Sequence, residues 1–79
     1  MNRNLAILLL EDEPIILMDL AFAVEDKGLE PLCATTVEDA LAIIAESPAV
    51  AVAVLDVSLA GGQTCTPVAR ELERRTIPY

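Results

Sequence analysis

Two continuous apolar runs, each followed by acidic residues, constrain the fold of this chain most. The first run covers residues 5–10 and is followed by the acidic triplet at 11–13, and the second covers residues 49–55 and is followed by Asp56. Neither run alternates with polar residues, and both have the length of a strand rather than a helix. Such runs are typical of strands that are buried on both faces of a parallel sheet.

The residues between and after these runs predict helices that alternate with strands. We expect strands at 5–10, 29–34 and 49–55, and helices at 14–27, at 36–46 and up to about residue 75. Pro14 suits the first turn of a helix, where its missing N–H costs nothing, and Gly28 suits the position after the last turn. Thr35 with Glu38 has the form of a capping box for the second helix. The order β-α-β-α-β-α requires parallel strands joined by right-handed crossovers, so the fold class is α/β, doubly wound, with helices on both faces of the sheet.

The composition of the chain limits the classes of partner that it can bind. The chain has 79 residues, enough for one small domain, and its 13 acidic against 5 basic residues give a net charge of −8, which repels nucleic acid and anionic membrane surfaces. No apolar run approaches the ~20 residues that cross a bilayer. The cysteines, Cys33 and Cys65, are far apart and the chain has no histidine, so neither a zinc site nor a disulfide framework is indicated. A reducing cytoplasm fits this pattern best.

The carboxylates that follow the two apolar runs predict a metal site. In a parallel sheet the carboxyl ends of all strands lie on one edge, so Glu11 and Asp12 share an edge with Asp56. If the two strands are neighbours, about 4.8 Å separates their backbones. Carboxylates that close repel one another unless a cation joins them, and hard oxygen ligands favour Mg²⁺. The alternative is that the triplet only caps the first helix, but a second carboxylate at the end of a buried strand favours the site.

Two blocks of the sequence, AILLLEDEPIILMDL and AVLDVSLAGG, resemble the receiver domain of two-component response regulators, as does their separation. The resemblance implies a flavodoxin-like fold with strand order 2-1-3, which agrees with Pro31, because proline cannot donate to a central ladder and so marks the second strand as an edge. It also implies a Mg²⁺ site made by Glu11, Asp12, Asp56 and the backbone carbonyl of Ser58. By the same resemblance, Asp56 accepts a phosphoryl group from a histidine kinase or phosphotransfer protein in phosphorelay signalling, without being a turnover enzyme.

The resemblance makes the chain a single partial receiver-like domain over residues 1–79. The closing stretch RRTIPY lies about where the family's fourth strand would begin, so strands four and five and the last helices have no counterpart. The family's hydroxyl residue after strand four and lysine after strand five are missing with them. Lys27 is expected at the edge opposite the acidic residues and does not replace that lysine. Three arginines are expected to be solvated rather than to bind phosphate: Arg70, Arg74 and Arg75.

The missing fourth strand predicts that the edge of the third strand is open, and we expect a homodimer through this exposed strand. The first helix would also lack the cover of a fifth helix, which exposes Phe22, whereas Met18 is expected to fill the core. Two alternatives stay open, a dimerising interaction module and an inert receiver fragment without phosphotransfer. An independent Mg²⁺-dependent phosphatase is less favoured, since no second general acid or base is spaced from Asp56 as such enzymes require.

Overall fold

Six elements follow one another in the computed structural model, which describes residues 5–47, 49–57, 59 and 62–79. They are β1 (Ala6–Leu10), α1 (Pro14–Asp26), β2 (Glu30–Ala34), α2 (Val37–Glu46), β3 (Val50–Leu55) and α3 (Thr66–Arg74). The predicted alternation of strands and helices is confirmed, and each predicted end lies within one residue of the observed end.

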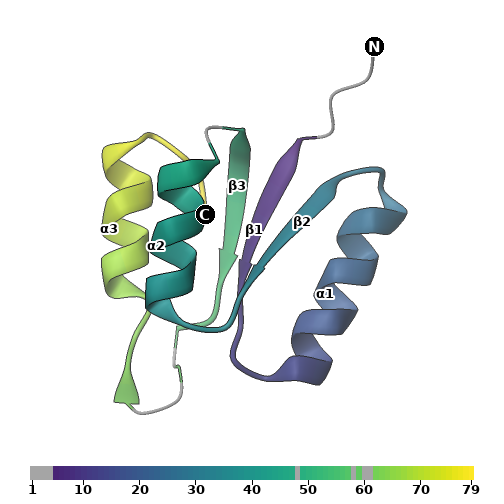
Figure 1. Cartoon of the computed structure of the whole chain (residues 1–79), viewed down its shortest axis with the longest axis horizontal. Helices are drawn as coiled ribbons and strands as arrows, with labels where there is room; N and C mark the ends of the chain where they lie inside the picture. The colour runs from purple at the N-terminus through teal and green to yellow at the C-terminus, as the bar shows by residue number, and fades with distance from the viewer. Residues whose placement is uncertain (1–4, 48, 58, 60–61) are drawn as a thin grey trace.

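The strands form one parallel sheet in the order β2-β1-β3. Leu8 in the central strand stands opposite Leu32 on one side and Ala53 on the other. The expected order 2-1-3 is confirmed, and β2, which carries Pro31, is an edge strand. Helices α2 and α3 lie on one side of the sheet and α1 lies on the other (Figure 1), so the α/β, doubly wound class is confirmed.

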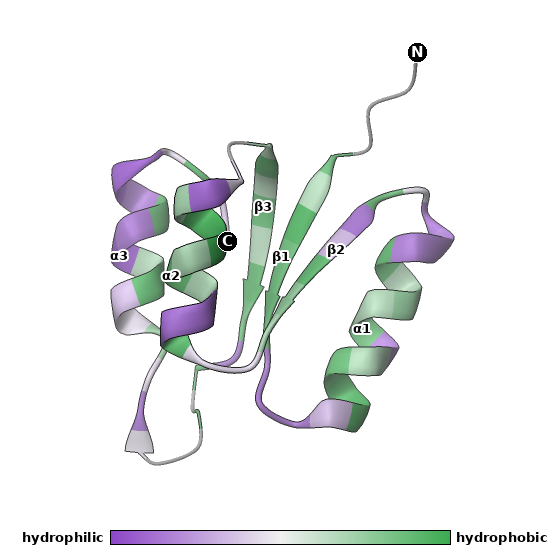
Figure 2. Cartoon of the chain, in the orientation of Figure 1, coloured by the Kyte–Doolittle hydropathy of each residue, from purple (hydrophilic) through white to green (hydrophobic). Residues whose placement is uncertain are grey.

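The main core lies between the sheet and the pair α2 and α3. Its most deeply buried members are aliphatic side chains: Leu8, Leu10, Ala40, Ile44, Val68 and Leu72. Each of these residues is 0% or 1% exposed, and burial of a large aliphatic side chain stabilises a fold by about 1.5–3 kcal/mol. The hydrophobic colouring of Figure 2 runs along the strands and the inner sides of these two helices.

The other face of the sheet is only partly covered, because α1 packs against β2 and β1 but not along β3. No residue of α1 is buried, and Leu17 and Leu20 are half-buried. Phe22 is 60% exposed, as expected, but Met18 is 52% exposed, so its expected place in the core is wrong. Val54 is 45% exposed on the uncovered side, so the third strand is not buried on both faces as its apolar run indicated.

The N-cap of α2 lies one residue later than the sequence predicted. The residue that caps α2 is Thr36, whose side-chain oxygen accepts a hydrogen bond from the Asp39 N–H at 3.1 Å, and not Thr35. Lys27 is the C-cap of α1, and Gly28 follows with φ +78°, in the left-handed region that glycine tolerates. The expected glycine termination of this helix is therefore confirmed.

The last residues of the chain lie beside β3. The Ile77 N–H donates to the Leu72 carbonyl at 2.9 Å and closes α3, and the Ala53 N–H donates to the Pro78 carbonyl at 3.0 Å. The outer edge of β3 was expected to be open along its whole length. Residues 77–79 cover part of it instead, because the chain turns back along the strand directly after α3.

Candidate metal centre

Backbone hydrogen bonds fix the positions of the acidic residues at one edge of the sheet. The Glu11 N–H donates to the Ala34 carbonyl at the end of β2 at 3.0 Å, and the Asp56 N–H donates to the Leu10 carbonyl at the end of β1 at 2.9 Å. These two bonds join the carboxyl end of the central strand β1 to both neighbouring strands. The backbones of Glu11 and Asp56 are therefore held by the sheet. These residues occupy the edge where parallel α/β sheets bind ligands.

Three carboxylates meet at this edge. Glu11, Asp12 and Asp56 each offer one oxygen atom, and these oxygens all lie within 4.8 Å of one another. All three side chains are half-buried, so water reaches them while the sheet restricts their movement. Two unit charges about 4 Å apart repel by about 1 kcal/mol in water and by more near a protein surface. We refer to these three residues as the acidic cluster.

The capping alternative explains one part of this arrangement. An oxygen of Glu11 accepts a hydrogen bond from the Glu13 N–H at 3.1 Å, just ahead of Pro14 at the start of α1. Glu13 itself makes no side-chain capping bond and is exposed. Helix capping therefore accounts for one oxygen of Glu11, but it does not account for the approach of Asp12 and Asp56 to the same point.

The donor set of the acidic cluster fits Mg²⁺. The three ligand atoms are hard carboxylate oxygens, and their partial exposure leaves room for the waters that Mg²⁺ keeps in its octahedral shell. Cys33 on β2 does not add a thiolate ligand to this set. Partial desolvation of its thiol and the charge of Glu25 raise the pKa of Cys33, which favours the protonated thiol. Ser58, whose backbone carbonyl the family resemblance adds to the site, lies outside the described residues.

Arg74 and Arg75, at the end of α3, pair with a carboxylate outside the acidic cluster. Glu71 binds Arg74 and Arg75, with nitrogen to oxygen distances of 2.6 Å and 2.5 Å. Hydrogen bonds from Arg74 and then Arg75 lower the pKa of Glu71 to about 2. Both arginines were expected to be solvated, but they share the carboxylate of Glu71, a pairing that the i,i+3 and i,i+4 spacing could have indicated.

Several solved structures have a similar fold. SdrG from Sphingomonas melonis Fr1 matches with a TM-score of 0.84 and 40% identity, over 98% of this chain and 65% of its own. The response regulator PhyR from Brucella abortus matches with a TM-score of 0.82 and 32% identity, over 96% of this chain and 32% of its own. The chain has the fold of a response regulator receiver domain. This receiver fold also matches PhyR from Bartonella quintana, an anti-anti-sigma factor, with a TM-score of 0.81 and 24% identity, over 99% of this chain and 32% of that one.

In its fold the chain is similar to receiver-type proteins, and it spans just under two thirds of SdrG, 65%, and 32% of each PhyR chain. No protein-family model and no curated protein sequence matches the receiver-like chain. Among the described residues, none of the helices has the length and apolar character needed to span a bilayer.

Proposed function

We propose that this chain is a receiver-type phosphoacceptor of a two-component phosphorelay, in which Asp56 takes a phosphoryl group from a histidine kinase or a phosphotransfer protein. One observation carries the proposal. Oxygens of Glu11, Asp12 and Asp56 lie within 4.8 Å of one another at the carboxyl edge of a receiver fold. A carboxylate in that position is a competent nucleophile toward phosphorus once its own charge is compensated.

The transfer step follows from the place of Asp56. An oxygen of its carboxylate attacks the phosphorus atom in line with the bond to the donor imidazole. The new O–P bond forms as the N–P bond breaks, and the imidazole nitrogen keeps the electron pair. The backbone bond from Asp56 to Leu10 holds the nucleophile at the end of a packed strand, so little reorganisation precedes the attack.

Glu11, Asp12 and Asp56 would hold Mg²⁺, with the backbone carbonyl of Ser58 as a further ligand on the family pattern. When bound, Mg²⁺ neutralises the carboxylates and the oxygens of the incoming phosphoryl group. Asp12 has no role in the covalent step, so it acts through the metal alone. The product is an acyl phosphate that stays on Asp56, which makes the chain a phosphoprotein that carries a signal rather than a turnover enzyme.

We also propose that the protein works in a reducing cytoplasm. Residues 1–79 would form a single partial receiver-like domain there. Both cysteines, Cys33 and Cys65, are free thiols, which suits that compartment.

We further propose a homodimer through the outer edge of β3. Residues 77–79, which we call the tail, cover this edge at Ala53. The proposed dimer contact therefore lies toward the carboxyl end of β3. Open strand edges of this kind recruit a further strand.

A dimerising interaction module without phosphotransfer is the second candidate function. The specific observation in its favour is the apolar surface of α1, where Ile15 is 69% exposed and Phe22 is 60% exposed. Exposed apolar side chains that gather on one helix are typical of surfaces that bind another protein. The hydrophobic colouring of α1 in Figure 2 reaches its outward side.

A phosphotransfer assay separates the two functions. The chain is incubated with a phosphotransfer protein that carries labelled phosphate on its histidine, with and without Mg²⁺. We expect Mg²⁺-dependent transfer of label to the chain and its release by hydroxylamine, which cleaves acyl phosphates. Asp19→Asn, which removes an exposed carboxylate of α1, is the matched control and should accept label as the parent chain does. A chain that stays unlabelled but dimerises would instead support the interaction module.

A further inference from the structure

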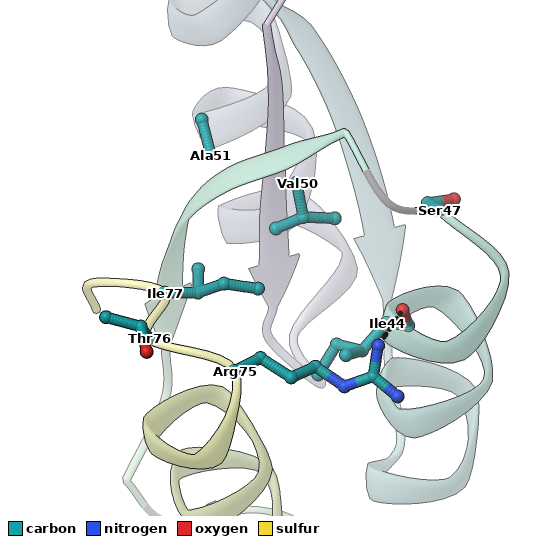
Figure 3. Close-up of a pocket in the computed structure, with 7 residues that line it drawn as sticks. All are labelled: Ile44, Ser47, Val50, Ala51, Arg75, Thr76 and Ile77. Carbon is teal, nitrogen blue, oxygen red and sulfur yellow. Dashed lines mark hydrogen bonds between the residues drawn. The ribbon is translucent and has the colours of Figure 1, made fainter.

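A cavity of about 390 Å³ opens at the edge of the sheet opposite the acidic cluster. It lies where α2 ends, β3 begins and the chain leaves α3 (Figure 3). Since Val50 starts β3 and Asp56 follows its end, the length of a six-residue strand, about 20 Å, separates the cavity from the acidic cluster. The proposed phosphotransfer makes no use of it.

The inner wall of the cavity is aliphatic. Ile44 from α2 and Val50 from β3 are 1% and 6% exposed, and the half-buried Ile77 faces them from the tail. An aliphatic wall of this kind favours an apolar group in the part of a ligand that it contacts.

Arg75 is the one charged side chain among the described residues that line the cavity. The Arg75 Nε donates to Glu71 at 2.5 Å, and its Nη1 donates to the Ile44 carbonyl at 3.4 Å. The guanidinium has five N–H donors, so these bonds leave donors for a further acceptor. The fork of an arginine suits a carboxylate, which it can bind through two parallel hydrogen bonds.

Two irregularities of the backbone lie in the wall of the same cavity. The ladder between β1 and β3 passes from the pair Ala6 and Val50 to the pair Ile7 and Val52, so Ala51 is an extra residue in a β-bulge. Thr76, a β-branched residue, has φ 59°, in the left-handed region. The left-handed conformation of a threonine costs stability, and both kinds of irregularity are frequent next to functional sites. Ala51 and Thr76 both belong to the residues that line the cavity.

We propose that this cavity binds a small carboxylate with a branched aliphatic tail. The tail contacts the aliphatic wall of Ile44, Val50 and Ile77, and the carboxylate pairs with the guanidinium of Arg75 at the mouth. The site is independent of the phosphoacceptor function, and either can fail without the other.

The test is a titration of the whole chain with 4-methylpentanoate, followed through backbone amide chemical shifts. Acetate offers the charge without the tail, and 4-methylpentanamide offers the tail without the charge. We expect saturable shifts at Val50 and Ile77 with 4-methylpentanoate, and binding that is weaker by about ten-fold or more with the other two probes. This comparison needs no variant, so it does not depend on whether a substituted chain folds.

A pair of variants locates the contact. Arg75→Met should weaken binding of 4-methylpentanoate by about ten-fold, and Arg74→Met by less than about two-fold, since Arg74 pairs with the same Glu71 but does not line the cavity. Ile77→Ala should weaken it by several fold with the charge intact. Equal binding of the acid and its amide, an equal loss in both arginine variants, or the absence of saturable shifts at Val50 and Ile77 would each overturn the proposal.

Discussion

The backbone N–H of Asp56 donates to the carbonyl oxygen of Leu10 at 2.9 Å, so the β1–β3 ladder extends to the residue that carries the proposed nucleophile. Leu10 is 1% exposed and belongs to the main core. The position of the nucleophile is therefore set by the same packing that stabilises the fold. In the absence of a cation, the carboxylates of the acidic cluster lie close enough to repel one another.

Asp12→Asn should stabilise the chain without metal and remove Mg²⁺ binding. Its carboxylate lies within 4.8 Å of two others, so its neutralisation relieves a repulsion of about 1 kcal/mol that falls with added salt. Urea unfolding in EDTA measures the first effect, and a calorimetric Mg²⁺ titration measures the second. Asp19→Asn is the matched control and should change neither quantity. A metal-free Asp12→Asn chain that is less stable than the parent would contradict the account.

Glu71→Gln should remove a part of the stability that depends on pH. The pKa of Glu71 is lowered from 4.5 to about 2 by Arg74 and Arg75, so the folded state favours the ionised carboxylate. The contribution is fully present above pH 4.5 and is lost as pH falls toward 2. The urea midpoints of the variant and the parent should therefore differ at pH 7 and converge near pH 2. A difference that stays constant across this range would show that the ion pair is not its source.

Thr76→Gly should raise the free energy of unfolding by about 0.5–1 kcal/mol, because glycine adopts the left-handed conformation without the penalty of a β-branched side chain. The residue follows the C-cap of α3 with φ 59°. Gly28→Ala is the reverse control, since a Cβ there meets no atom within 4 Å and only the backbone conformation, φ +78°, opposes it. It should destabilise by a similar amount in thermal unfolding. A destabilised Thr76→Gly chain would refute this view of the helix end.

Association through β3 should give a dimer in light scattering whose population rises with concentration. Val54→Lys places a charge on the exposed strand and should yield a monomer with an unchanged circular dichroism spectrum. Ile15→Lys places the same charge on the exposed part of α1 and should leave the dimer intact. Dissociation by Ile15→Lys but not by Val54→Lys would move the interface to α1, and a monomer at all concentrations would exclude both surfaces.

The sequence predicted the order of elements and the strand order well, because both follow from local signals. The unbroken apolar runs and the helix-terminal residues Pro14 and Gly28 depend only on the chain around them. The proximity of Asp12 to Asp56 was also predictable, since a parallel sheet brings the carboxyl ends of its strands to one edge.

The errors concern properties that depend on what covers each face. Apolar content alone placed Met18 in the core and Val54 on a strand buried on both faces, but α1 covers only β2 and β1. Adjacent threonines, Thr35 and Thr36, offered two possible caps, and the structure uses the second. The return of the tail along Ala53 and the cavity beside Arg75 are contacts between distant segments, which no local pattern in the sequence encodes.

The central claim is that Asp56 accepts a phosphoryl group, and intact mass after incubation with acetyl phosphate tests it most directly. The parent chain should gain the mass of one phosphoryl group in the presence of Mg²⁺ and none in EDTA, and Asp56→Asn should gain none in either, because an amide is not a nucleophile toward phosphorus. A parent chain that gains no mass with Mg²⁺, or an Asp56→Asn chain that gains as much as the parent, would contradict the claim.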